Sequence, residues 1–123
     1  MNIKKLRSAV DKLKEDLGDG LIASDIWMVA DGQSICGYNP QPKATALFNQ
    51  VTTFLNKSLK TSNFPALGKF YIIDLTDHKM VMIIPMEEYQ WGMLVDSRNV
   101  QMGLLLNVIL PDIVLKFKEA LAQ

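Results

Sequence analysis

Residues with metal-binding or redox-active side chains are scarce in this 123-residue sequence, which has one cysteine, Cys36, and one histidine, His78. A single cysteine excludes a disulfide within the chain and suits a reducing compartment. A zinc site needs three or four convergent ligands, and the sequence offers neither a second histidine nor a cysteine cluster. We therefore predict no metal site and no disulfide framework.

An excess of charge of one sign is also missing, because 13 Lys and Arg balance 13 Asp and Glu. Nucleic-acid binders usually carry a basic excess. The longest apolar run, residues 104–110, is interrupted by Asn107 and is far shorter than the ~20 residues that span a bilayer. Residues 1–17 are too evenly charged for a secretory signal. We expect a cytoplasmic protein with no nucleic-acid partner and no membrane insertion, forming a single domain over residues 1–123.

The first half of the chain predicts helix, strand, strand and helix. Apolar residues recur three and four apart over residues 2–17, which is the pattern of an amphipathic helix. Residues 21–30 are apolar on both faces, as in a strand buried on two sides. Asp31-Gly32 favours a tight hairpin into a short strand over residues 33–38. A second helix is predicted over residues 43–62.

The second half predicts three strands and a final helix. Apolar runs over residues 69–75, 79–84 and 89–95 are separated by short turns, which indicates an antiparallel meander. Residues 100–121 are helical in length and composition, but Pro111 should kink or divide this helix near residues 107–110. The order indicates an α+β sandwich with one five-stranded antiparallel sheet.

No group of side chains predicts an enzyme. Glu87 and Glu88 are adjacent, so their side chains point to opposite faces of a strand or, in a turn, to water. We interpret His78 as a surface residue of a hairpin turn and Cys36 as a small apolar residue that fills space on a strand. No glycine-rich loop opens a helix to hold phosphate. We predict no catalytic residue and no cofactor.

Asp25 is the unusual polar residue, because it lies in a strand that is otherwise apolar. A buried carboxylate needs hydrogen bonds or an opposite charge. We expect it to be satisfied at the edge of the strand by backbone amides or by a lysine such as Lys4 or Lys5.

Four stretches together resemble the roadblock/dynein light chain family, which includes bacterial and archaeal regulators of small GTPases. They are "MVADGQSICGY", the long helix from Lys43, the meander "GKFYIIDLTDHKMVMIIPMEEYQWGMLVD", and "DSRNVQMGLLL" at the entry to the last helix. The order of these stretches is more specific than any one of them. The sequence departs from the family pattern at Pro111 and at Asp77-His78, where Asp-Gly is commoner.

The resemblance implies a profilin-like fold with helices on both faces of the sheet. The first and third predicted helices would cover one face and the second helix the other. A single helix cannot cover a whole face of five strands, so a twofold mate would cover the rest and pair with an open edge strand. In the family, third strands pair and second helices pack in a symmetric dimer. The resemblance therefore implies a dimer interface that contains Phe48, Thr52, Leu55, Leu59, Lys69, Phe70, Tyr71, Ile72 and Ile73.

The function implied by the resemblance is that of a non-enzymatic, homodimeric module that binds a small Ras-like GTPase and regulates it, as an activator or a scaffold. Two alternatives remain. "DGQSICGYNPQP" is also similar to the PAS sensory fold, in which Ile35 and Asn39 would match a ligand-binding motif. The third interpretation is a longin- or profilin-like adaptor without a GTPase partner.

Overall fold

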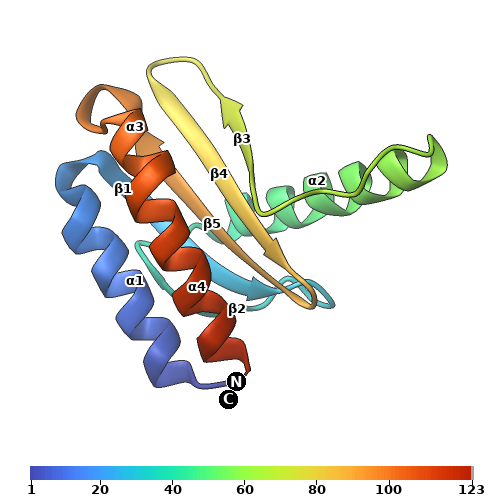
Figure 1. Cartoon of the computed structure of the whole chain (residues 1–123), viewed down its shortest axis with the longest axis horizontal. Helices are drawn as coiled ribbons and strands as arrows, with labels where there is room; N and C mark the ends of the chain where they lie inside the picture. Colours follow the sequence, from blue (N-terminus) through green and yellow to red (C-terminus); the bar gives the residue numbers. More distant parts are fainter. Residues whose placement is uncertain (123) are drawn as a thin grey trace.

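The computed structural model describes residues 1–122, which form helices on both sides of one sheet (Figure 1). Short 3-10 turns follow α1 and β5. The elements along the chain are α1 (Ile3–Leu17), β1 (Leu21–Met28), β2 (Ser34–Tyr38), α2 (Pro42–Thr61), β3 (Tyr71–Asp74), β4 (Lys79–Met86), β5 (Tyr89–Asp96), α3 (Met102–Leu104), a π-helical segment (Leu105–Ile109) and α4 (Leu110–Leu121).

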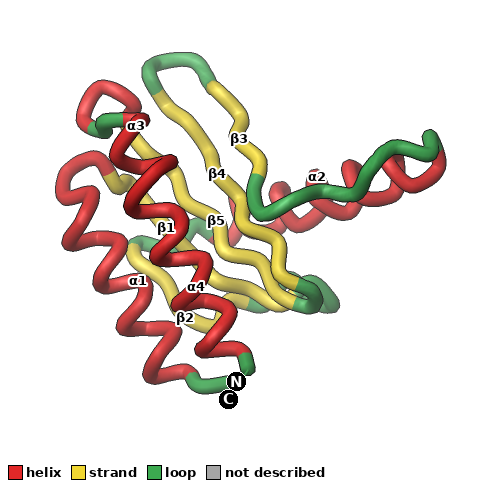
Figure 2. Tube along the Cα trace, in the orientation of Figure 1, coloured by secondary structure: helices red, strands yellow, loops and turns green. Residues whose placement is uncertain are grey.

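The five strands form one antiparallel sheet in the order β2-β1-β5-β4-β3 (Figure 2). The central strands β1 and β5 are buried almost throughout, which explains why residues 21–30 are apolar on both faces. Strands β2 and β3 form the two edges. The predicted fold class, the element order and the placing of helices on both faces are confirmed.

Helices α1 and α4 lie together on one face and close the main core. Leu6 and Leu13 of α1 and Ile113 and Phe117 of α4 are fully buried. The ring of Phe117 meets Trp91 of β5 edge-on, with 5.5 Å between the ring centroids. The N- and C-terminal ends of the described chain are adjacent, because the amide of Asn2 donates to the carbonyl oxygen of Ala120. This face is a continuous apolar layer.

Pro111 is accommodated by a change of helical pitch. The chain passes from α3 through the π-helical segment Leu105–Ile109, and Pro111 occupies the first turn of α4. Proline has no amide hydrogen and its ring crowds the carbonyl four residues earlier, so a regular α-helix cannot pass through it unchanged. The wider π turn relieves this conflict. The predicted interruption before Pro111 is confirmed.

All five strands differ from the predicted ranges by one or more residues at an end, and the differences in β3 and β4 are instructive. Strand β4 continues to Met86 rather than residue 84, because Pro85 and Met86 still pair with β5. Strand β3 covers only Tyr71–Asp74, so three residues of the predicted strand 69–75 lie outside it. The sequence predicts the ends of a strand from its apolar residues, and apolar residues also continue into the neighbouring loops. Hydrogen bonding to the partner strand decides where the strand ends.

Helix α2 begins over the other face of the sheet, and its C-terminal half extends beyond the sheet (Figure 1). It is one unbroken helix of 20 residues. The several short helices of a PAS fold are therefore not present here, and that alternative is wrong for the fold. In residues 1–122 no helix has the length and apolar character to cross a membrane.

Candidate interaction site

The face of the sheet beneath α2 carries a second apolar cluster, which is smaller than the main core. Trp27, Val81 and Ile83 are buried in it, and the half-buried Phe48 of α2 and Leu94 of β5 pack against them. Side chains along a strand alternate between the two faces, so these residues and the core residues come from the same strands. The cluster is small because α2 covers only part of this face.

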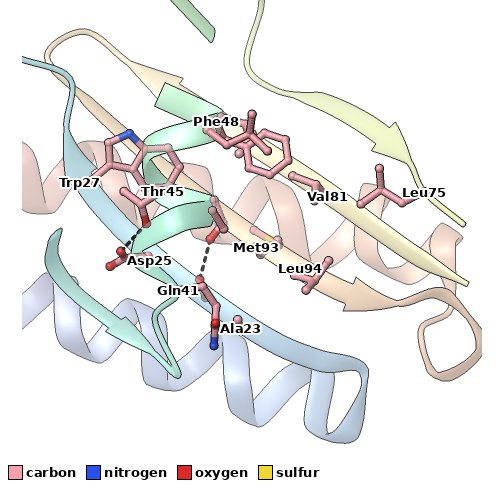
Figure 3. A pocket seen from close by; sticks show the side chains of 15 residues that line it. Ala23, Asp25, Trp27, Gln41, Thr45, Phe48, Leu75, Val81, Met93 and Leu94 are labelled. Atoms are coloured by element: carbon pink, nitrogen blue, oxygen red, sulfur yellow. Dashed lines mark hydrogen bonds between the residues drawn. The ribbon is translucent and has the colours of Figure 1, made fainter. Parts of the chain in front are cut away.

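An apolar groove lies beside α2, where the sheet is left uncovered (Figure 3). Its volume is about 280 Å³. One wall is formed by Ala44, Leu47 and Phe48 of α2, and the floor is formed by the strands. The strand residues that line the groove include Ala23, Trp27, Val81 and Leu94, together with Leu75, which follows β3. Such an apolar groove is suited to another apolar surface.

Asp25 holds the start of α2 to the sheet. Its carboxylate accepts hydrogen bonds from the Ser34 hydroxyl of β2 at 2.5 Å and from the Thr45 hydroxyl of α2 at 2.9 Å. Burial raises the pKa of the Asp25 carboxyl above its ordinary value, although these two hydrogen bonds act to lower it. Of the two expected kinds of partner, the lysine is wrong, because Lys4 and Lys5 are exposed on α1. The backbone amide is confirmed at Ile26, and the hydroxyls of Ser34 and Thr45 supply the other hydrogen bonds.

Three further hydrogen bonds fasten α2 along the sheet. Trp27 Nε1 donates to Asn49 Oδ1 at 3.2 Å, and Asn49 Nδ2 donates to the carbonyl oxygen of Val29 at 3.0 Å. The hydroxyl oxygens of Thr52 and Tyr71 lie 2.7 Å apart, and burial raises the pKa of the Tyr71 phenol. Helix α2 is therefore joined to β1 and β3 by specific hydrogen bonds, in addition to its contacts with the small cluster.

The apolar side of α2 is mostly open to solvent. Only Thr45 and Thr52 of this helix are buried. Leu47 is 52% exposed and Phe54 is 69% exposed, and Phe64 in the following loop is 66% exposed. Large apolar side chains at this exposure, next to an apolar groove, indicate a surface that a partner can cover.

The structure divides the nine residues of the predicted dimer interface among three places. Of the four on α2, Thr52 is buried and the other three are half-buried. In β3, Tyr71 and Ile73 pair with residues of the α2 face of β4, whereas Ile72 packs against the main core on the opposite face. Lys69 and Phe70 lie exposed in the loop before β3.

Leu47 and Phe54 belong to the exposed apolar side of α2 but were missing from the predicted interface. Both follow the helical apolar period of residues 43–62, which is the signal that could have found them. The sequence pattern gives the apolar side of a helix, but it does not give how far the sheet extends beneath that side.

The other candidate residues do not join this face. Cys36 is half-buried on β2 on the side of α1, and burial raises the pKa of its thiol, which makes the thiolate scarcer. His78 is exposed in the turn between β3 and β4, where Asp77 and His78 both have positive φ (61° and 58°), as in a type I′ hairpin turn. Within residues 1–122, no three Cys, His, Asp or Glu side chains gather as a metal site would require.

Comparison with solved structures identifies the fold. Myxococcus xanthus MglB superposes with a TM-score of 0.81 at 10% identity, covering 98% of this chain and 90% of that one. A Roadblock/LC7 domain from Streptomyces avermitilis gives 0.70 at 10% identity, covering 95% and 98%. Acanthamoeba castellanii profilin II gives 0.57 at 12% identity, covering 92% and 98%. No family model and no curated protein sequence matches the chain. The expected profilin-like, roadblock-type fold is confirmed.

Proposed function

We propose that this chain is a non-enzymatic, homodimeric interaction module that binds a small Ras-like GTPase and regulates it. The observation that carries the proposal is the apolar groove beside α2, together with the exposed apolar side of that helix. The roadblock-type fold supports it, because the roadblock resemblance implies both self-association and a GTPase partner. A cytoplasmic location is part of the same proposal.

The proposed dimer places a second copy on the open part of the α2 face. Strand β3 is hydrogen-bonded to β4 on one side and is an edge on the other, so it can pair with the β3 strand of a second copy. A twofold axis beside β3 would bring the overhanging half of α2 across the neighbouring groove. Covering Leu47 and Phe54 would contribute about 1.5–3 kcal/mol for each side chain that is fully buried.

The dimer is tested by adding a charge to the apolar side of α2. We expect the unmodified protein to be a dimer by light scattering at micromolar concentration, and Leu47→Glu or Phe54→Glu to be a folded monomer, because an unpaired carboxylate is costly to bury. Asn56→Glu is the matched control, since it adds the same charge at an exposed polar position of the same helix, about 160–180° around it from Phe54 and Leu47. A monomeric unmodified protein, or equal dissociation by Asn56→Glu, would contradict the proposed interface.

The GTPase partner is tested by pull-down with Ras-like GTPases encoded beside this chain, each loaded with GDP or with a non-hydrolysable GTP analogue. We expect retention of one GTPase with a preference for one nucleotide. Binding to none of them would remove the regulatory part of the proposal and leave the second candidate, a profilin-like adaptor, which the likeness to profilin II favours.

Activation of GTP hydrolysis would distinguish a regulator from a scaffold. The only arginines are Arg7 and Arg98, and Arg98 is held by Asp96 in an ion pair of 2.9 Å. Neither lies in a loop shaped to reach a nucleotide, so we propose that any activation repositions the GTPase's own groups rather than supplying an arginine finger. Single-turnover hydrolysis should then be unchanged by Arg7→Ala and by Arg98→Ala.

A further inference from the structure

The charges of this neutral protein are divided unevenly along the chain. Residues 32–73 contain no aspartate and no glutamate but include four lysines, Lys43, Lys57, Lys60 and Lys69. The rest of the chain holds nine of the 13 basic residues and all 13 acidic ones. Helix α2 lies wholly within the acid-free segment. Although the net charge of the chain is zero, α2 is basic and the rest of the protein has an excess of acidic residues.

Three of these lysines lie on one exposed row of α2, which we call the basic strip and define as Lys43, Ala46, Gln50, Thr53, Lys57 and Lys60. These residues are spaced three and four apart, so they share one face of the helix. All six are exposed. At 100° per residue, the middle of the strip lies roughly 140° around the helix from the middle of Ala44, Leu47 and Phe48, which line the groove. A partner seated in the groove therefore leaves most of the basic strip exposed, and the strip borders the apolar side of α2 where Gln50 lies between Leu47 and Phe54.

The lysines of the basic strip have no acidic partner within residues 1–122, whereas on each of the other two long helices one lysine has such a partner. On α1, Lys12 pairs with Asp16 at 2.9 Å, and on α4, Lys116 pairs with Asp112 at 2.8 Å, both with i,i+4 spacing. The three salt bridges of the described chain all lie outside residues 32–73. An ordinary solvated helix face carries both signs, as α1 and α4 do. The basic strip is different, because α2 contains no acidic residue at all.

We propose that the basic strip is the docking surface for an acidic surface of a protein partner. A protein fits better than an anionic membrane, because Ala46 is the only apolar residue of the strip, and three lysines contribute only about 1 kcal/mol each near an anionic bilayer. Gln50 and Thr53 between the lysines can exchange hydrogen bonds with a polar protein surface. The proposal goes beyond the GTPase assignment, since it specifies a surface and its chemistry for whichever protein binds there.

The test maps the binding of an acidic polypeptide directly. A glutamate-rich peptide is titrated into the ¹⁵N-labelled full chain, and backbone amide shifts are followed by NMR. We expect the shift changes to cluster on residues 43–60 and to weaken at least about tenfold between low and high salt, because exposed charge pairs are screened. The same titration is repeated with vesicles that contain phosphatidylserine. No GTPase is used, so failure here is separate from failure of the pull-down.

A matched pair of charge reversals decides the site. K43E/K57E/K60E should weaken peptide binding at least about tenfold, and K4E/K5E/K118E should leave it within about twofold, although both variants change the net charge equally. Lys4, Lys5 and Lys118 are likewise exposed on helices. Circular dichroism checks that each variant is folded. Equal loss in both variants, or shift changes outside α2, would overturn the proposal. Binding to vesicles without binding to the peptide would replace it with a membrane surface.

Discussion

The two faces of the sheet are held to their helices in different ways. On the face of α1 and α4, a continuous apolar layer includes fully buried side chains such as Leu13, Trp91 and Phe117. On the face of α2, a small cluster around Trp27 is supplemented by hydrogen bonds that Asp25 accepts from Thr45 and Asn49 accepts from Trp27. Apolar packing closes the first face completely. The second face has fewer buried side chains, and part of its apolar surface stays exposed beside α2.

This difference would allow one small protein to be stable and also to bind a partner through α2. The main core supplies stability without using the α2 face, because α1 and α4 bury their apolar stripes within the chain. Helix α2 can then be positioned by a few specific contacts and still present an apolar side to a partner. We therefore expect substitutions to lower stability strongly on the face of α1 and α4 and less on the face of α2.

The largest effect is expected for Phe117→Ala, which removes a fully buried ring from the α1/α4 face. A cavity of this kind should lower the free energy of unfolding by about 3–5 kcal/mol, measured by urea denaturation. Phe48→Ala on the α2 face should cost only about 1–2 kcal/mol, because its ring is half-buried. Leu115→Ala, on the exposed side of α4, is the control and should change stability by less than about 0.5 kcal/mol. Equal costs at Phe117 and Phe48 would remove the distinction between the faces.

The next effect is expected for Gly92→Ala, which adds a methyl group on the α2 face of β5. The added Cβ would lie 2.8 Å from two ring carbons of Trp27 and 3.0 Å from Ile83 Cδ1, so the indole must move. Overpacking of this kind should cost about 1–3 kcal/mol and alter the tryptophan fluorescence. Gly103→Ala is the control, because nothing lies within 4 Å of its added Cβ. Unchanged fluorescence and stability in Gly92→Ala would show that Trp27 is not fixed against β5.

A smaller effect is expected for Asn49→Ala, which tests the hydrogen bonds of the α2 face. The substitution leaves the indole N–H of the buried Trp27 without its acceptor and should cost about 1–2 kcal/mol in urea denaturation. Asn56→Ala, at an exposed position of the same helix, should be neutral or slightly stabilising, since alanine is the better helix former. If the two variants were equally stable, hydrogen bonding at Asn49 would contribute nothing to the attachment of α2.

Most of the fold was predictable because it follows from periodicity that a short window of sequence contains. The helical period of residues 43–62 gave α2, and the turns around Asp77 gave the meander. The partners of Asp25 were not predictable, because Thr45 lies 20 residues away on a helix whose docking position no local pattern specifies. The exposure of Leu47 and Phe54 was missed for a similar reason. It depends on how far α2 extends beyond the sheet, which is a property of the assembled layers.

The smallest effect is a dependence of stability on pH that comes from Asp25. Burial raises the pKa of this carboxyl in the folded protein above its unfolded value of about 3.9. A group with a raised folded pKa stabilises the fold fully below the unfolded pKa, and this contribution is lost as pH rises through the folded pKa. Asp25→Asn has no charge to bury. The stability of the unmodified protein should therefore fall relative to Asp25→Asn as pH rises from about 4, in parallel urea titrations. A difference that stays constant with pH would mean that the hydroxyls of Ser34 and Thr45 fully offset the burial of the carboxylate, and that hydrogen bonds alone can hold a charge on the α2 face.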